Sequence, residues 1–265
     1  MRKMLTPQQV QKVYEDREPD KPYVIEHEFE GKLLVFFGSV HNNDPQHVQW
    51  QELEKYWSKF LAHPNKRKVV LVEGHAKLSA SATKEQALER GESTLGIWMA
   101  RQANIAVNSP EPDRVREVYF LRDRFSTDQI LAYYFGRQMH QWYRQDRKIS
   151  PDWRLYAEDL TNHLNELRCW DEQITLDKAL AAYKQETGKD FEPEDYASMY
   201  ALSDPYQYEV SAASGDFRDE LLMEKIKKMF EMGNDLFIIF GSGHAIKLEP
   251  AIKELISNKQ SPPQR

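Results

Sequence analysis

The sequence contains one cysteine, Cys169, among 265 residues. A lone thiol excludes an intramolecular disulfide framework and any zinc site built from several cysteines. Long apolar runs are also absent, because no stretch approaches the roughly 18 consecutive apolar residues of a membrane span. The N-terminal residues show no apolar core of a signal peptide. We therefore expect a cytoplasmic protein with no membrane as a partner.

The sequence also has no excess of positive charge. Lysine and arginine total 36 against 42 aspartates and glutamates, which gives a formal net charge of −6. Phosphate backbones require a basic surface, so nucleic acid is excluded as the main ligand. The hydrophobic content of 40% and aromatic content of 12% are enough to build a globular core. We expect a small-molecule or peptide substrate, and the composition sets no expectation for the oligomeric state.

Short apolar segments carry the signal for strands. Residues 33–37 are apolar at every position, which is typical of a strand covered on both faces. Glu30 and Gly31 join segments 23–29 and 32–37 and predict a hairpin. Further strands are predicted at residues 69–72, 105–107 and 236–240. Because helical segments separate them, the sequence predicts an α/β fold with a mostly parallel central sheet, flanking helices and an N-terminal hairpin.

Helical patterns occupy most of the remaining chain. Asp44 and Pro45 suit the N-cap and first position of a helix that continues to about residue 62. Other helices of the core are predicted near residues 6–15, around 92–100, and at 217–230 and 247–255. The middle of the chain carries helical patterns at 125–143, 151–167, 175–187 and 192–202. We therefore expect an α/β core domain of residues 1–112 and 210–265, and a helical insertion or lid at 113–209.

One motif occurs twice. Residues 34–41 and 237–244 each have an apolar strand followed by Gly, Ser, one residue and His. The carboxyl ends of parallel strands line the ligand crevice of an open sheet. We therefore predict that His41 and His244 lie in one site. The alternative is that each Gly-Ser makes a turn and each histidine caps a helix.

Carboxylates follow the other strands. Glu73 ends the second apolar strand, and Glu111 follows the third. Two histidines and a carboxylate can bind a divalent metal and leave open positions for water. Without metal, a carboxylate can fix the tautomer of a histidine that activates water. Both possibilities make His41, Glu73 and His244 the leading catalytic or metal-binding candidates.

The paired motifs resemble a superfamily that includes Tiki metalloproteases, TraB/PrgY proteins, erythromycin esterases and ChaN-like haem-binding proteins. Supporting matches are Val72-Glu73, Gly91-Glu92 and Arg218-Asp219 with Met223. The resemblance covers about residues 23–110 and 213–257. It implies both histidines and a glutamate in one cleft of an α/β fold, with Glu92 as a further candidate. Glu111 and Arg218 complete the set of secondary site residues.

The resemblance implies two kinds of chemistry. In the Tiki branch the site is proposed to be that of a protease that uses a divalent metal. In the erythromycin-esterase branch a histidine supported by a glutamate is thought to activate the water that attacks a lactone. We expect a hydrolase of an ester, lactone or peptide bond, with Zn, Mn or Co as the candidate metal. The alternatives are a non-catalytic protein that binds haem or a metal in this cleft, and a regulatory scaffold with a vestigial site.

Overall fold

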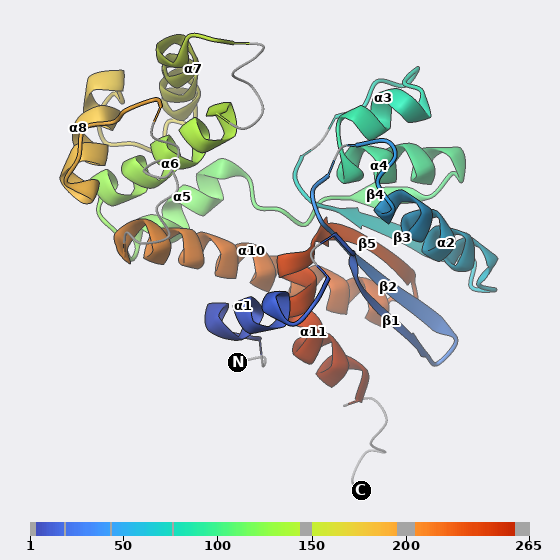
Figure 1. Cartoon of the computed structure of the whole chain (residues 1–265). Coiled ribbons are helices and arrows are strands. Elements are labelled where there is room, and N and C mark those ends of the chain that lie inside the picture. Colours follow the sequence, from blue (N-terminus) through green and yellow to red (C-terminus); the bar gives the residue numbers. More distant parts are fainter. Residues whose placement is uncertain are drawn as a thin grey trace, which may run out of the picture. The chain divides into compact units, whose positions relative to one another are not determined.

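A computed structural model describes residues 4–18, 20–42, 44–75, 77–143, 150–194 and 205–257, except for the side chains of 205–208. Its sheet has the strand order β1-β2-β5-β3-β4 (Figure 1). The first two strands pair antiparallel, and the other three pairings are parallel. The strands are β1 (Tyr23–Phe29), β2 (Lys32–Ser39), β3 (Lys68–Val72), β4 (Ala106–Asn108) and β5 (Asp235–Gly241). The predicted α/β fold, with its mostly parallel sheet and N-terminal hairpin, is confirmed.

The chain divides into two compact units, Met1–Glu111 with Arg218–Arg265, and Pro112–Phe217. The first unit holds the whole sheet. Its helices are α1 (Pro7–Glu15), α2 (Gln49–Ala62), α3 (Lys84–Glu89), α4 (Glu92–Gln102), the C-terminal part of α10 (Pro205–Glu231), and α11 (Ser242–Ser257). The first sequence-based boundary, at residue 112, lies within one residue of this division, and the second, at residue 210, lies eight residues before it.

The sheet is covered on both faces, as its continuous apolar strands predict. On one face Val35, Phe37 and their neighbours pack against α2 and α4. On the other face Leu34, Phe36 and their neighbours pack against α10 and α11. Alternate residues of β2 therefore enter two separate cores, and this double burial holds the ends of the central strands in place.

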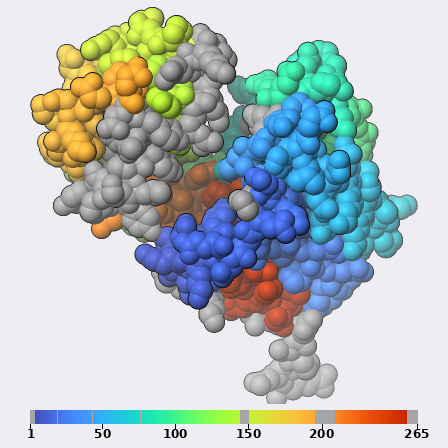
Figure 2. Space-filling view, viewed as in Figure 1, coloured from blue at the N-terminus to red at the C-terminus, as the bar shows by residue number. Residues whose placement is uncertain are grey.

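Helix α1 lies on the surface of the first unit. It buries none of its residues fully, and Figure 2 shows it in dark blue at the molecular surface beside red residues of the C-terminal segment. A capping box of Thr6 and Gln9 begins the helix. Tyr14 then hydrogen-bonds Ser242 at 2.7 Å, which ties α1 to the first turn of α11.

Within its described residues, the second unit consists of helices and the loops that join them. It contains α5 (Arg114–Arg122), α6 (Thr127–Gln141), α7 (Trp153–Glu166), α8 (Leu176–Thr187) and the first part of α10. Helix α5 begins at the N-cap Asp113, whose carboxylate accepts from the backbone N–H of Arg116. No separate helix is predicted there from the sequence. Most of the helix predicted at 192–202 lies outside the described residues.

Three core helices begin at other residues than the sequence predicts. Helix α10 begins at Pro205 rather than at residue 217. Helix α2 begins at Gln49 rather than at Pro45, because the side chains of Asn42 and Asp44 accept backbone hydrogen bonds in local turns. Helix α11 begins directly after β5 at Ser242 rather than at residue 247. His244 therefore stands in the first turn of a helix, where its side chain is held more firmly than in a loop. None of the described helices has both the length and the apolar character needed to cross a membrane.

Candidate functional site

The two Gly-Ser-x-His motifs meet at the carboxyl ends of neighbouring strands. Strands β2 and β5 are parallel partners, and their register pairs Ser39 with Gly241. Strand β3 flanks β5 on its other side and ends at Val72, just before Glu73. The topology therefore brings His41, Glu73 and His244 to one edge of the sheet, as the sequence predicts.

The glycines of the motifs permit close approaches at this edge. A Cβ on Gly38 would lie 2.7 Å from the carbonyl oxygen of Tyr23 and 2.8 Å from Cβ of Ala245. A Cβ on Gly241 would lie 2.9 Å from Cε1 of His41. Real Cβ atoms do not tolerate such distances, so a side chain at either position would displace its neighbours. The His41 ring therefore lies directly over the α-carbon of Gly241.

His41 forms a dyad with Glu92. Nδ1 of His41 lies 2.5 Å from Oε1 of Glu92, and the Ser39 hydroxyl donates to the same oxygen at 2.9 Å. The His41 side chain is 57% exposed, whereas that of Glu92 is 9% exposed. Burial opposes ionisation of Glu92, but the hydrogen bond and charge of His41 outweigh it and lower the pKa of Glu92. An ionised Glu92 accepts the Nδ1 proton and orients the ring, so that Nε2 can act as a base whenever the His41 ring is neutral.

His244 forms a second dyad with Asp219. Nδ1 of His244 lies 2.5 Å from Oδ1 of Asp219, and Nζ of Lys247 lies 2.7 Å from the other carboxylate oxygen. Burial disfavours the charged form of both partners, but their mutual attraction outweighs it. The pKa of Asp219 is lowered, and the pKa of His244 is raised. No local sequence pattern links Asp219 to a histidine 25 positions away, so only the resemblance of Arg218-Asp219 pointed to it.

Glu73 lies between the two dyads. Its Oε2 accepts the backbone N–H of Gly241 at 2.7 Å, and its Oε1 lies 3.7 Å from Nε2 of His244. Arg218 donates to Oε1 at 2.9 Å. Burial would raise the pKa of Glu73, but the charges of His244, Arg218 and His41 with the Gly241 hydrogen bond lower it to about 2. Glu73 is therefore an ionised anchor, and the carboxylates that contact the Nδ1 atoms are Glu92 and Asp219.

Arg218 joins Glu73 to Glu111. Its Nε and Nη2 atoms donate to the two oxygens of Glu111 at 2.6 and 2.7 Å, which is a bidentate pair. Burial disfavours the charge of Arg218, but Glu111 and Glu73 outweigh it and raise the pKa of Arg218. The secondary site residues Glu92, Glu111 and Arg218 therefore all lie at the same edge as His41, Glu73 and His244.

The donors of this edge do not form a ready metal site. Within the described ranges, no group of three or more His, Cys, Asp or Glu side chains is arranged to hold a metal ion. The contacts of both Nδ1 atoms with carboxylates are compatible with a metal on Nε2. Both oxygens of Glu73, however, already accept protein hydrogen bonds. The Arg218 guanidinium supplies a fixed positive charge next to Glu73, where a metal ligand set would place its cation. The donor geometry does not fit a metal held jointly by His41, Glu73 and His244.

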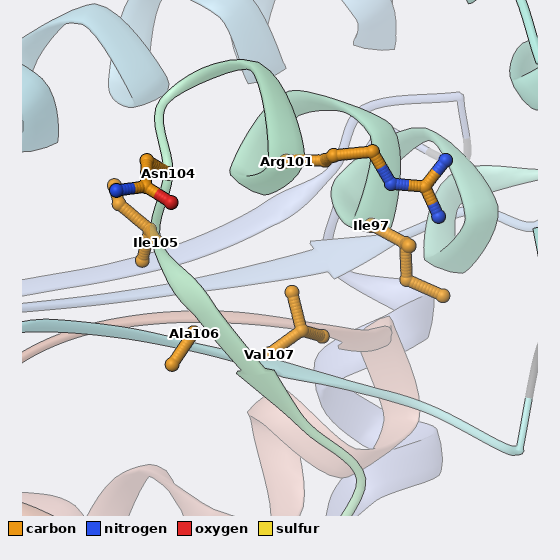
Figure 3. Close-up of a pocket in the computed structure, with 6 residues that line it drawn as sticks. All are labelled: Ile97, Arg101, Asn104, Ile105, Ala106 and Val107. Atoms are coloured by element: carbon orange, nitrogen blue, oxygen red, sulfur yellow. The ribbon is translucent and has the colours of Figure 1, made fainter. Parts of the chain in front are cut away.

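A cavity of about 510 Å³ lies elsewhere, beside the edge strand β4. Figure 3 shows its lining side chains on the C-terminal half of α4, the following turn and β4, among them Ile97, Arg101 and Val107. It includes none of the charged residues at the carboxyl edge of the sheet. The cavity is therefore separate from the two dyads.

Serine nucleophiles are not favoured by the geometry. Ser39 is buried, and its hydroxyl supports Glu92. The hydroxyl of Ser242 bonds Tyr14 instead of a histidine. The two serines therefore have unlike structural roles despite their matching places in the motif.

Comparison of the chain with models of protein families, with curated proteins and with solved structures finds no match.

Proposed function

We propose that this protein is a hydrolase that cleaves an ester, lactone or peptide bond with a water molecule activated by His41. The observation that carries the proposal is the dyad of an exposed imidazole and a buried, ionised carboxylate, 2.5 Å apart. Such a pair orients the ring, and in the neutral ring the Nε2 atom can accept a proton from water. The resemblance of the paired motifs to erythromycin esterases and Tiki proteases supports the same class of reaction.

The reaction needs one proton to be taken up and returned. Nε2 of His41 removes a proton from water while the water oxygen attacks the substrate carbonyl carbon. The tetrahedral intermediate then collapses, the bond to the leaving group breaks, and the leaving group receives the proton from His41. The products are a carboxylic acid and an alcohol or amine, and the dyad returns to its starting state.

His244 contributes charge to this site. The neighbouring carboxylates Asp219 and Glu73 favour its protonated form, and Asp219 holds its orientation. A fixed positive charge near a carbonyl that is under attack stabilises the developing negative charge. We therefore assign His41 as the general base and His244 as an electrostatic partner, with Glu73 as the anchor between them.

A panel of probe substrates tests the proposal. Wild-type protein is incubated with p-nitrophenyl esters, a fluorogenic lactone and a labelled casein, in parallel with the His41→Ala and His244→Ala variants. The matched control is His163→Ala, because the side chain of His163 is 55% exposed on α7 in the other unit. We expect hydrolysis to fall by about 10²-fold or more in the His41 variant and to be unchanged in the control. Full activity in both site variants would overturn the proposal.

The same experiment separates the alternatives. Activity that survives dialysis against EDTA supports the histidine–glutamate base, whereas activity lost with EDTA and restored by Zn, Mn or Co supports a metal. No turnover of any probe, together with a haem absorption band that disappears in the His41 and His244 variants, supports a non-catalytic binding protein. A protein that neither hydrolyses any probe nor shows the haem band supports a vestigial site.

The cellular compartment is a separate proposal. The single cysteine, Cys169, is buried, and burial raises the pKa of its thiol. A protein without disulfides suits a reducing compartment, so we propose that it works in the cytoplasm. Fractionation of the source cells tests this, and recovery of the protein from an oxidising compartment would contradict it.

A further inference from the structure

Arg218 has more donors than its two carboxylate partners use. Its Nε and Nη2 atoms donate to Glu111 and Glu73. Across the described part of the chain, its remaining nitrogen, Nη1, makes no hydrogen bond, and it is not among the fully enclosed polar atoms that lack a partner. The Arg218 side chain is 16% exposed. The Nη1 end of this rigid, fully charged group is therefore not completely enclosed.

Glu73 sets the position of the Arg218 donors relative to the proposed base, His41. One oxygen of Glu73 accepts from Nη2 of Arg218, and the other accepts from the backbone of Gly241. The His41 ring lies over the α-carbon of Gly241. A single carboxylate therefore links Arg218 to the strand end beneath the His41 ring, which brings the arginine and the imidazole to the same part of the site.

We propose that Arg218 is a catalytic residue whose Nη1 atom donates to the substrate carbonyl oxygen and stabilises the oxyanion formed when water attacks. This inference rests on the proposed hydrolase function and deepens it. The bidentate contact with Glu111 holds the guanidinium in place before substrate arrives, so no reorganisation is needed as the charge develops.

The test uses phenylphosphonate, a tetrahedral anion that imitates the intermediate and binds without turnover. Its affinity is measured by calorimetry for wild-type protein and Arg218→Lys, since a lysine ammonium cannot serve Glu111, Glu73 and a ligand in one fork geometry. The double variant Arg218→Met with Glu111→Leu replaces the buried pair by apolar groups and protects the measurement against misfolding. The matched control is Arg101→Met, which removes an arginine that bonds the carbonyls of Leu78 and Ser79 away from the site.

We expect phenylphosphonate affinity to fall by about tenfold or more in both Arg218 variants and to be unchanged in the Arg101 variant. For a hydrolysed probe ester, kcat should fall by about 10²-fold with little change in KM. Unchanged phosphonate affinity in both Arg218 variants, or no phosphonate binding by wild-type protein, overturns the inference and leaves the hydrolase proposal intact. Arg218-dependent binding without hydrolysis of any probe overturns the hydrolase proposal and retains the anion-binding role of Arg218.

Discussion

Nδ1 of His244 lies 2.5 Å from Asp219, and Nδ1 of His41 lies 2.5 Å from Glu92. The two dyads come from the same motif, but their surroundings differ. The His41 side chain is 57% exposed, whereas that of His244 is 17% exposed and also lies 3.7 Å from Glu73. A duplicated sequence pattern therefore produces two histidines with unlike chemistry, one open to water and one held beside two carboxylates.

Glu92→Gln tests the orientation of the base. The amide cannot carry the negative charge that holds the Nδ1 proton of His41, so the favoured tautomer is lost. We expect kcat on a hydrolysed probe ester to fall by about 10²-fold, with a smaller fall for Ser39→Ala, which removes a hydrogen bond to Glu92. Steady-state kinetics measures both, and wild-type kcat in Glu92→Gln would show that the dyad has no catalytic role.

Gly241→Ala tests the close approach between the motifs. The added Cβ would lie 2.9 Å from Cε1 of His41, so the ring must move away from its place over the strand end. We expect about a 10²-fold loss of kcat. The matched control is Gly215→Ala on α10, where the added Cβ would meet no atom within 4 Å beyond the local helix backbone, and the exchange should stabilise the helix by up to about 1 kcal/mol. Equal activity of the two variants would show that catalysis does not depend on the position of the His41 ring.

The lowered pKa of Glu73 predicts a pH dependence of stability. Its value of about 2 in the folded protein lies below the ordinary value of 4.5, so Glu73 stabilises the fold above pH 4.5. This contribution, on the order of 3 kcal/mol, is lost as the pH falls from 4.5 towards 2. Urea unfolding at several pH values should show a shallower acid dependence for Glu73→Gln than for the wild type. Parallel curves would contradict the lowered pKa.

Asp235→Ala tests the opposite end of strand β5. Asp235 is fully buried and accepts from the backbone of Leu33 and from Lys68, and it also contacts His63. Removing it leaves buried donors and a cation without their partner, so we expect the free energy of unfolding to fall by about 3–5 kcal/mol. At a temperature where the variant stays folded, kcat should match the wild type, because the site lies at the other end of the strand. A large fall in kcat would place Asp235 among residues that position the site.

Much of the fold follows from local sequence patterns. The continuous apolar strands predicted a sheet covered on both faces, and Glu30-Gly31 predicted the hairpin. Helix boundaries were harder to predict, because competing local hydrogen bonds decide them. At Asp44 the side chain capped a turn instead of the helix, and at Ser242 the helix began as soon as the strand ended. The full length of α10 is also not predictable from one amphipathic face, because its two halves pack into two different hydrophobic cores.

The sequence by itself determined that two Gly-Ser-x-His strand ends and Glu73 would share one edge of a parallel sheet. This was possible because parallel strands all end on the same side, so the order of elements is enough to place them. Only the tertiary structure decided which carboxylate contacts which histidine. Glu92 reaches His41 from the start of α4, and Asp219 reaches His244 from α10, over separations of 51 and 25 residues. Such contacts depend on how helices pack on the sheet, and no short sequence pattern encodes that.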